Sequence, residues 1–231
     1  MSKSLRLPYN KLQTLEVSIS RPISRDALVV PRVEVGEITP GPIDVSLIDL
    51  EMVNGNTTLF EQLFVLSVAK RWQCKRVFEF GTFDGKTSAN LAVNLQQDAQ
   101  IFTIDLPAGQ LGSVALPIGK HDLPFILKNR IGDKLGGSAK VIQLYGDTAR
   151  FDFSSWYGSC DLVFVDACHE YEYVLNDSEI ALKLLAHGGV VLWHDYGNWV
   201  GVTNALNDLY SRDERFRNLR HIVGSTLCLL T

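Results

Sequence analysis

Residues 77–88 combine an apolar run, a glycine turn and a helical pattern, and this order limits the fold more than any other segment does. The run 77–80 predicts a strand ending at Phe80, which leaves Gly81 where a side chain would block a ligand from the backbone. Gly85 then begins a helix whose free N–H groups point at that ligand. A dinucleotide turn of the G-x-G-x-x-G type needs glycine where Phe83 stands. The segment therefore predicts a binding loop for a small ligand without a pyrophosphate.

Short apolar runs alternate with helical patterns after residue 50, which predicts an α/β domain around a mostly parallel sheet. Five runs have the pattern of strands buried on both faces: 77–80, 101–105, 141–144, 162–165 and 190–193. Helices are expected near residues 59–69, 173–186 and 202–210. The segments 219–223 and 226–230 predict an antiparallel C-terminal hairpin, so the sheet is expected to have seven strands.

Two segments depart from this alternation. Residues 1–50 contain Pro22, Pro31, Pro40 and Pro42 without sustained periodicity, and we expect an extended N-terminal arm on a domain formed by residues 51–231. Residues 106–140 form a long connection, rich in glycine and proline, between the second and third of these strands. Connections of this length are often lids, so this one is expected to fold over the bound ligand.

The composition limits the class of protein. With 46% hydrophobic and 21% charged residues, the 231-residue chain has the composition of a soluble globular protein. A net charge of −4 without clustered basic residues argues against nucleic acid as the main partner. The four cysteines are widely spaced, which favours a reducing compartment over disulfides or a zinc site. No membrane-spanning stretch or signal-peptide core occurs, so we expect a cytoplasmic protein without membrane contact.

Five segments, in order, resemble the motifs of class I S-adenosylmethionine-dependent methyltransferases. They are the acidic-x-G-x-x-x-G pattern at 79–85, I-F-T-I-D at 101–105, G-D-T at 146–148, D-x-x-H-x-Y at 166–171 and G-G-x-x-x-x-H-D at 188–195. The last two are similar to the subfamily with macrocin-type sugar O-methyltransferases and cephalosporin-hydroxylase-like proteins. The resemblance covers residues 55–231 and implies a Rossmann-like three-layer α/β sandwich that transfers a methyl group to a small-molecule or saccharide hydroxyl.

The resemblance also implies a cofactor site for S-adenosylmethionine, formed by Glu79, Gly81, Thr82, Gly85, Thr87, Asp105, Asp147, Thr148 and Asp166. Asp105 offers two acceptor oxygens for the ribose hydroxyls, or else it caps the next helix. Asp147 either approaches the adenine amino group or begins a turn. Glu79 is expected to orient the methionine end of the cofactor, because a buried carboxylate needs a positive partner.

A metal site is expected from Asp166, His194 and Asp195. Asp166 and Asp195 end strands that the family topology makes neighbours, about 4.8 Å apart, so a divalent cation such as Mg or Mn would balance their charges. Metal-dependent relatives have a carboxylate where this chain has His194, and an imidazole suits manganese, iron or zinc better than magnesium. Alternatively, one aspartate caps a helix and the other is solvated.

The resemblance makes His169 the general base that removes the acceptor's proton, and an imidazole can do this at neutral pH. A structural histidine beside Tyr171 is the alternative. Two other functions stay open: a non-catalytic Rossmann-like ligand-binding protein and a nucleotide-dependent oxidoreductase, which the glycine spacing disfavours. The sequence does not select the acceptor, and it is compatible with a homo-oligomer.

Overall fold

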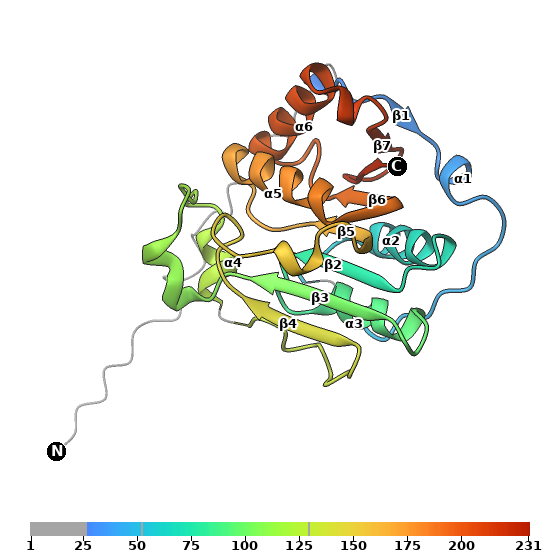
Figure 1. Ribbon diagram of the computed structural model, residues 1–231, viewed down its shortest axis with the longest axis horizontal. Coiled ribbons are helices and arrows are strands. Elements are labelled where there is room, and N and C mark those ends of the chain that lie inside the picture. The colour runs from blue at the N-terminus through green and yellow to red at the C-terminus, as the bar shows by residue number, and fades with distance from the viewer. Residues whose placement is uncertain (1–26, 52, 129) are drawn as a thin grey trace, which may run out of the picture.

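The computed structural model describes residues 27–51, 53–128 and 130–231, which form an α/β domain (Figure 1). Its strands are β1 (Arg32–Val33), β2 (Arg76–Phe80), β3 (Gln100–Asp105), β4 (Val141–Tyr145), β5 (Cys160–Val165), β6 (Leu185–Trp193), β7 (Arg220–Ile222) and β8 (Cys228–Leu230). The helices are α1 (Val35–Ile38), α2 (Leu59–Arg71), α3 (Lys86–Asn94), α4 (Leu123–Leu127), α5 (Tyr171–Leu184) and α6 (Val200–Arg212). Short 3-10 turns at Ala108–Ser113, Ser154–Trp156 and Glu214–Phe216 complete the described elements.

The strands form one sheet in the order β1-β7-β8-β6-β5-β2-β3-β4. All pairs are parallel except those of β8 with β6 and β7, which confirms the mostly parallel sheet and the antiparallel C-terminal hairpin. The expected count of seven strands is wrong, because the described residues contain eight. The extra strand is β1, which extends the sheet edge through a bond from His221 N–H to the Pro31 carbonyl (2.8 Å). Two residues are too few for a periodic pattern to reveal.

Two apolar layers fill the faces of the sheet. Along β5, Val163 and Val165 pack into the layer beneath α5 and α6, whereas Leu162 and Phe164 pack into the layer beneath α2 and α3. This alternation explains why the central strands are apolar at nearly every position. The result is the expected three-layer sandwich, with the connection containing α4 beyond the arrowheads of β3 and β4 (Figure 1).

One predicted boundary is wrong. Residues 185 and 186, expected at the end of a helix, begin β6, which starts five residues before the expected strand. Leu185 pairs with Cys160, and the register shifts before Val190 pairs with Leu162. The irregular start and the two glycines Gly188 and Gly189 obscure the strand pattern in the sequence.

Residues 27–50 of the predicted arm lie along the domain (Figure 1). Ser46 N–H donates to Asn94 Oδ1 (2.8 Å) and Ile48 N–H to Asn90 Oδ1 (3.1 Å), so side chains of α3 hold this segment. Residues 1–26 of the predicted arm lie outside the described residues. Within the described ranges, no helix is both long and apolar enough to cross a bilayer.

Candidate active site

A cavity of about 280 Å³ lies at the carboxyl ends of β2, β3, β5 and β6. The structure brings together eight of the predicted site residues in its wall: Gly81, Asp105, Asp147, Thr148, Asp166, His169, His194 and Asp195. Four others, Glu79, Thr82, Gly85 and Thr87, are not in its wall. The connection 106–140 contributes Ile118, Phe125 and Ile126 to the wall. The predicted lid, as we call this connection, therefore lines the cavity.

Gly81 forms the sharp turn after β2. Its φ of +90° lies in the region that favours glycine, and a Cβ there would lie 1.9 Å from the Asp166 carbonyl oxygen. The neighbouring backbone of β5 therefore excludes a side chain at this position. Gly85 also has a positive φ, but Leu135 covers it, since a Cβ there would lie 2.8 Å from Leu135 Cδ2. The lid thus closes over the start of α3.

Asp105 and Asp147 face the cavity from neighbouring strand ends. Asp105 accepts from the N–H groups of Phe83 (2.6 Å) and Leu106 (2.7 Å), one on each oxygen, and burial raises its pKa to about 6. The 3-10 turn that follows is capped by Pro107, so Asp105 is no helix cap. The N–H of Thr82 also hydrogen-bonds to this carboxylate, and its remaining acceptor capacity can take a ligand hydroxyl.

Asp147 begins the turn after β4, which is one of the two roles expected for it. Its Oδ1 accepts from Ala149 N–H (2.9 Å) and from the Tyr173 hydroxyl (3.0 Å), and its Oδ2 accepts from Ala115 N–H (2.6 Å). The hydrogen bond from Ala115 N–H connects the lid to the end of β4. The neighbouring Thr148 is almost fully buried and hydrogen-bonds to the buried carboxyl of Asp177.

His194 lies at the centre of a group of carboxylates. Its Nδ1 is 2.9 Å from Asp166 Oδ1 and 3.3 Å from Asp195 Oδ2, and its Nε2 is 3.3 Å from Glu61 Oε2. Burial alone would lower the pKa of His194, but the facing charges of Asp166 and Asp195 raise it well above the usual value. The imidazole is therefore charged in this arrangement and balances part of the acidic group.

His169 joins the same group on its other side. Its Nε2 is 3.0 Å from Asp195 Oδ2, and its Nδ1 pairs with Asp122 in the lid. Burial opposes protonation, yet the hydrogen bonds to these two carboxylates raise the pKa of His169 to about 10. His169 is thus a charged donor at neutral pH, and it must lose a proton before it can act as a base.

The donor set of Asp166, His194 and Asp195 fits a divalent cation. One ligand atom from each residue lies within 4.8 Å of the others, and all three residues are largely buried. Because Nε2 of His194 faces Glu61, Nδ1 is the nitrogen that points toward the two aspartates. A carboxylate behind a ligating histidine is common at metal sites, where it fixes the ring orientation. Asp195 also has φ +68°, and such backbone strain concentrates at functional sites.

Comparison with known proteins identifies the family. Residues 78–196 match the sequence model described as "Methyltransferase domain". The chain belongs to this methyltransferase family. The matched segment runs from β2 to the residue that follows Asp195, so this methyltransferase domain contains every predicted site residue.

Individual relatives of the methyltransferase domain are distant. A flavonoid 3',5'-methyltransferase from Vitis vinifera is 28% identical over 149 residues, which are 63% of this chain and 57% of that protein. The match thus spans little more than half of the relative. The SAH-bound methyltransferase PaMTH1 of Podospora anserina (TM-score 0.54, 18% identity, 76% and 79% of the two chains) shares the fold. Cofactor-bound Rv0187 from MTB does as well (TM-score 0.53, 18% identity, 78% and 83%).

Two residues of the cavity wall that contact its histidines were not predicted from the sequence. Glu61 is in the first turn of α2, where it forms a capping box with Thr58 and also accepts from Thr226 N–H (2.8 Å). The T-x-x-E spacing before an apolar run predicts the cap but not the contact with His194. Asp122 lies in the lid, far along the chain from His169, and no local pattern indicates that they meet.

Glu79 is buried away from the cavity wall. Its Oε2 accepts from the hydroxyls of Ser88 (2.5 Å) and Thr103 (2.6 Å), and burial raises its pKa to about 8. The two hydroxyls, and not a positive charge, satisfy the carboxyl group in this structure. Thr82 belongs to the same cluster, with its hydroxyl 2.7 Å from that of Thr103. Thr87 is on α3, with its hydroxyl 3.4 Å from Gln62 Oε1.

Glu79→Gln should remove a pH dependence of stability from the methyltransferase domain. The folded pKa of Glu79 is above its ordinary value of 4.5, so the folded protein binds a proton that the unfolded chain releases between about pH 4.5 and 8. The wild type should therefore lose about 4 kcal/mol of its free energy of unfolding, relative to the variant, between pH 5 and 9. Urea denaturation at both pH values measures this difference.

Glu172→Gln, at an exposed residue of α5, is the matched control and should keep the pH dependence of the wild type. If the free energy of unfolding changed with pH in the same way in Glu79→Gln and in the wild type, the protonated state of Glu79 in the folded protein would be contradicted. We also expect the affinity of Glu79→Gln for S-adenosylmethionine to stay within about twofold of the wild type. A tenfold loss would instead support the contact with the methionine end that the sequence suggests.

Proposed function

We propose that this chain is an S-adenosylmethionine-dependent O-methyltransferase for a small-molecule or saccharide hydroxyl, assisted by a divalent cation. One observation carries the proposal: a single cavity holds both Asp105 and the Asp166–His194–Asp195 group. The first is suited to a ribose, and the second to a cation and the oxygen that it activates. The family membership supports the reaction type.

Different residues of the cavity would bind the cofactor and the methyl acceptor. The cofactor would lie over the turn at Gly81, with its ribose hydroxyls donating to Asp105. Thr148 and Asp147 would border its adenine. Displacement at the sulfonium methyl group is in line, so the protein mainly aligns the donor and the acceptor and removes the acceptor's proton. The lid residues in the cavity wall would exclude water from both.

Asp166, His194 and Asp195 would hold the cation, and the imidazole favours Mn over Mg. A bound cation would lower the pKa of a coordinated hydroxyl and offset the charge of Asp195, which together with Asp122 keeps His169 protonated. His169 would then take the acceptor's proton at Nε2. Its Nδ1 contact with Asp122 holds the ring in place for this role.

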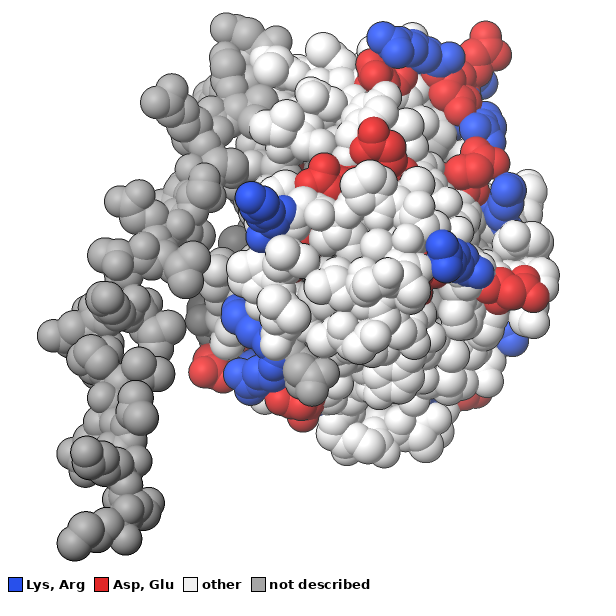
Figure 2. Space-filling model, turned by 90° about the vertical axis from the view of Figure 1, so that its left-hand side faces the viewer, with Lys and Arg blue, Asp and Glu red and all other residues white. Residues whose placement is uncertain are grey.

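The surroundings favour a largely apolar acceptor with a ring. Phe125, Ile118 and Trp199 line the cavity, and Trp199 stacks on His169 with ring centroids 4.5 Å apart. Figure 2 shows the side of the molecule that carries the lid, and its described surface has few charged side chains among many uncharged ones. The name of the Vitis vinifera relative also points to an aromatic acceptor. We therefore rank an aromatic hydroxyl above a saccharide.

Methyl transfer can be followed with S-adenosylmethionine labelled in its methyl group. We expect label to appear in a catechol-type acceptor, to fall at least tenfold after treatment with EDTA, and to return with Mn²⁺. A saccharide with free hydroxyls forms the second arm of the test and should accept less label. Transfer that EDTA leaves unchanged would contradict the role of the cation, and failure to bind the cofactor would contradict the function itself.

A further inference from the structure

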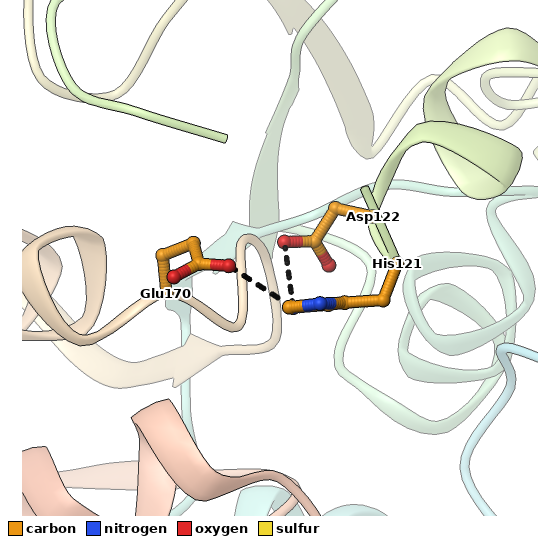
Figure 3. Close-up of side chains that lie close together, drawn as sticks. All are labelled: His121, Asp122 and Glu170. Carbon is orange, nitrogen blue, oxygen red and sulfur yellow. Dashed lines mark ion pairs between the residues drawn. The ribbon is translucent and has the colours of Figure 1, made fainter. Parts of the chain in front are cut away.

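Three side chains meet where the lid contacts the start of α5, outside the Asp166–His194–Asp195 group (Figure 3). His121 Nε2 is 3.2 Å from Glu170 Oε1 and 3.6 Å from Asp122 Oδ2. Ligand atoms of all three residues lie within 4.8 Å of one another. His121 and Asp122 come from the lid just before α4, and Glu170 is the residue that precedes α5. We call these three residues the clip cluster.

We propose that the clip cluster is a second metal site, which binds a zinc-type cation and fastens the lid to the body of the domain. Two ligands on one tetrahedral zinc ion, each bound at about 2.0–2.1 Å, lie about 3.3 Å apart. The two contacts of His121 bracket this spacing. A cation would therefore enter with only small movements of the ligand atoms.

The backbone and the neighbouring rings prepare this geometry. A Cβ at Gly119 would lie 1.9 Å from Glu170 Oε1 and 2.6 Å from His121 Cε1, so any other residue there would displace these two side chains from their present positions. The His121 ring stacks on Trp199 with centroids 4.9 Å apart and planes 28° apart. Stacking fixes the plane of the imidazole, and a ligating ring needs a fixed plane.

Charge and access favour a cation at the same place. Asp122 and Glu170 carry two negative charges, and His169, which pairs with Asp122 Oδ1, offsets part of one of them, so a divalent ion would balance the rest. Asp122 is buried and oriented, since its Oδ1 pairs with His169 and its Oδ2 receives the Cys168 thiol (3.3 Å). The side chains of His121 and Glu170 are 40% and 29% exposed, so an ion and a completing water can reach them without unfolding.

The consequence concerns the lid. Asp122 and the lid residues Phe125 and Ile126 line the cavity that we assign to the cofactor and the acceptor. An ion at the clip cluster would hold this wall in the closed position. The proposal uses His121, Asp122 and Glu170, none of which belongs to the Asp166–His194–Asp195 group, so zinc binding at the clip cluster can be tested separately from the proposed function.

Zn²⁺ binding to the full chain tests the proposal by stoichiometry. We expect two ions per wild-type chain, and one fewer in both His121→Ala and Glu170→Gln. His194→Ala should also lose one ion, but from the other group. His187→Ala changes an exposed histidine on β6 and is the matched control, which should bind as the wild type does.

If the other metal group binds no zinc, the wild type should bind one ion and His121→Ala none, so the two proposals fail separately. If His121→Ala and Glu170→Gln both bound zinc with the stoichiometry and affinity of the wild type, the proposed zinc site at the clip cluster would be overturned. Circular dichroism of the zinc-free variants checks folding. Should His121→Ala not fold, Glu170→Gln decides the result, because it preserves the size and shape of a half-buried side chain.

Trypsin cleavage in the lid provides a second readout, since Lys120, Lys128 and Arg130 are exposed. Zn²⁺ should slow cleavage after these residues at least fivefold in the wild type and in His194→Ala, but not in Glu170→Gln. If Zn²⁺ slowed trypsin cleavage equally in Glu170→Gln and in the wild type, the proposed zinc site at the clip cluster would be overturned.

Discussion

His169→Ala is expected to lower the rate of methyl transfer about a thousandfold and to leave the affinity for S-adenosylmethionine within about twofold. A positioned general base typically contributes 10²–10⁴-fold to a rate. His169 is in the wall of the cavity, next to Asp195, whereas Asp105 and Gly81 are at the part of the cavity that we assign to the cofactor. Steady-state kinetics and calorimetric titration of the variant with S-adenosylmethionine separate the two effects.

Three controls make the His169 result specific. His187→Ala should keep the full rate. His169→Gln can still donate to one carboxylate but cannot act as an imidazole base, so it should also be slow. Because Asp122 and Asp195 lose their shared partner, the melting temperature of each variant must be measured. Transfer at the wild-type rate by a folded His169→Ala protein would remove this residue from the mechanism.

Asp105→Ala is expected to weaken binding of S-adenosylmethionine about a hundredfold. A hydrogen bond to a charged group contributes about 1.5–3 kcal/mol, and Asp105 offers the acceptor capacity left by its backbone partners to the ribose hydroxyls. The loss of one or two such bonds gives the expected factor. Calorimetric titration of the variant and the wild type measures it.

The pH dependence of binding tests the same carboxylate. The pKa of Asp105 is about 6, so its carboxyl group is ionised at pH 7.5 and mostly protonated at pH 5. Affinity of the wild type should therefore fall as the pH drops through 6, and Asp105→Ala should lack this dependence. Asp98→Asn, at an exposed carboxylate before β3, should bind as the wild type does. Equal affinities of Asp105→Ala and the wild type would contradict the ribose contact.

Local patterns predict most of the fold because the central strands are short, apolar and separated by helices with clear periodicity. They miss β1, whose two residues join the sheet only through a long-range contact with β7. They also misplace the start of β6, where a register shift and glycines hide the strand. In both places tertiary pairing, and not local propensity, decides the structure.

Sequence patterns likewise predict only part of the candidate site. Asp105, Asp166 and Asp195 follow apolar strands, and the carboxyl ends of parallel strands meet at one edge, so the sequence could bring them together. Glu61 and Asp122 reach the site from α2 and the lid, and only the folded chain places them beside the two histidines. No local pattern indicates that both nitrogens of His169 face carboxylates, which is what makes its pKa high.

Equilibrium dialysis of the full chain against S-adenosylmethionine tests the central claim most directly. We predict one molecule bound per chain with micromolar affinity, displaced by S-adenosylhomocysteine and weakened about a hundredfold by Asp105→Ala. No binding at millimolar cofactor, or binding that Asp105→Ala leaves unchanged, would contradict the assignment of this cavity to the methyl donor.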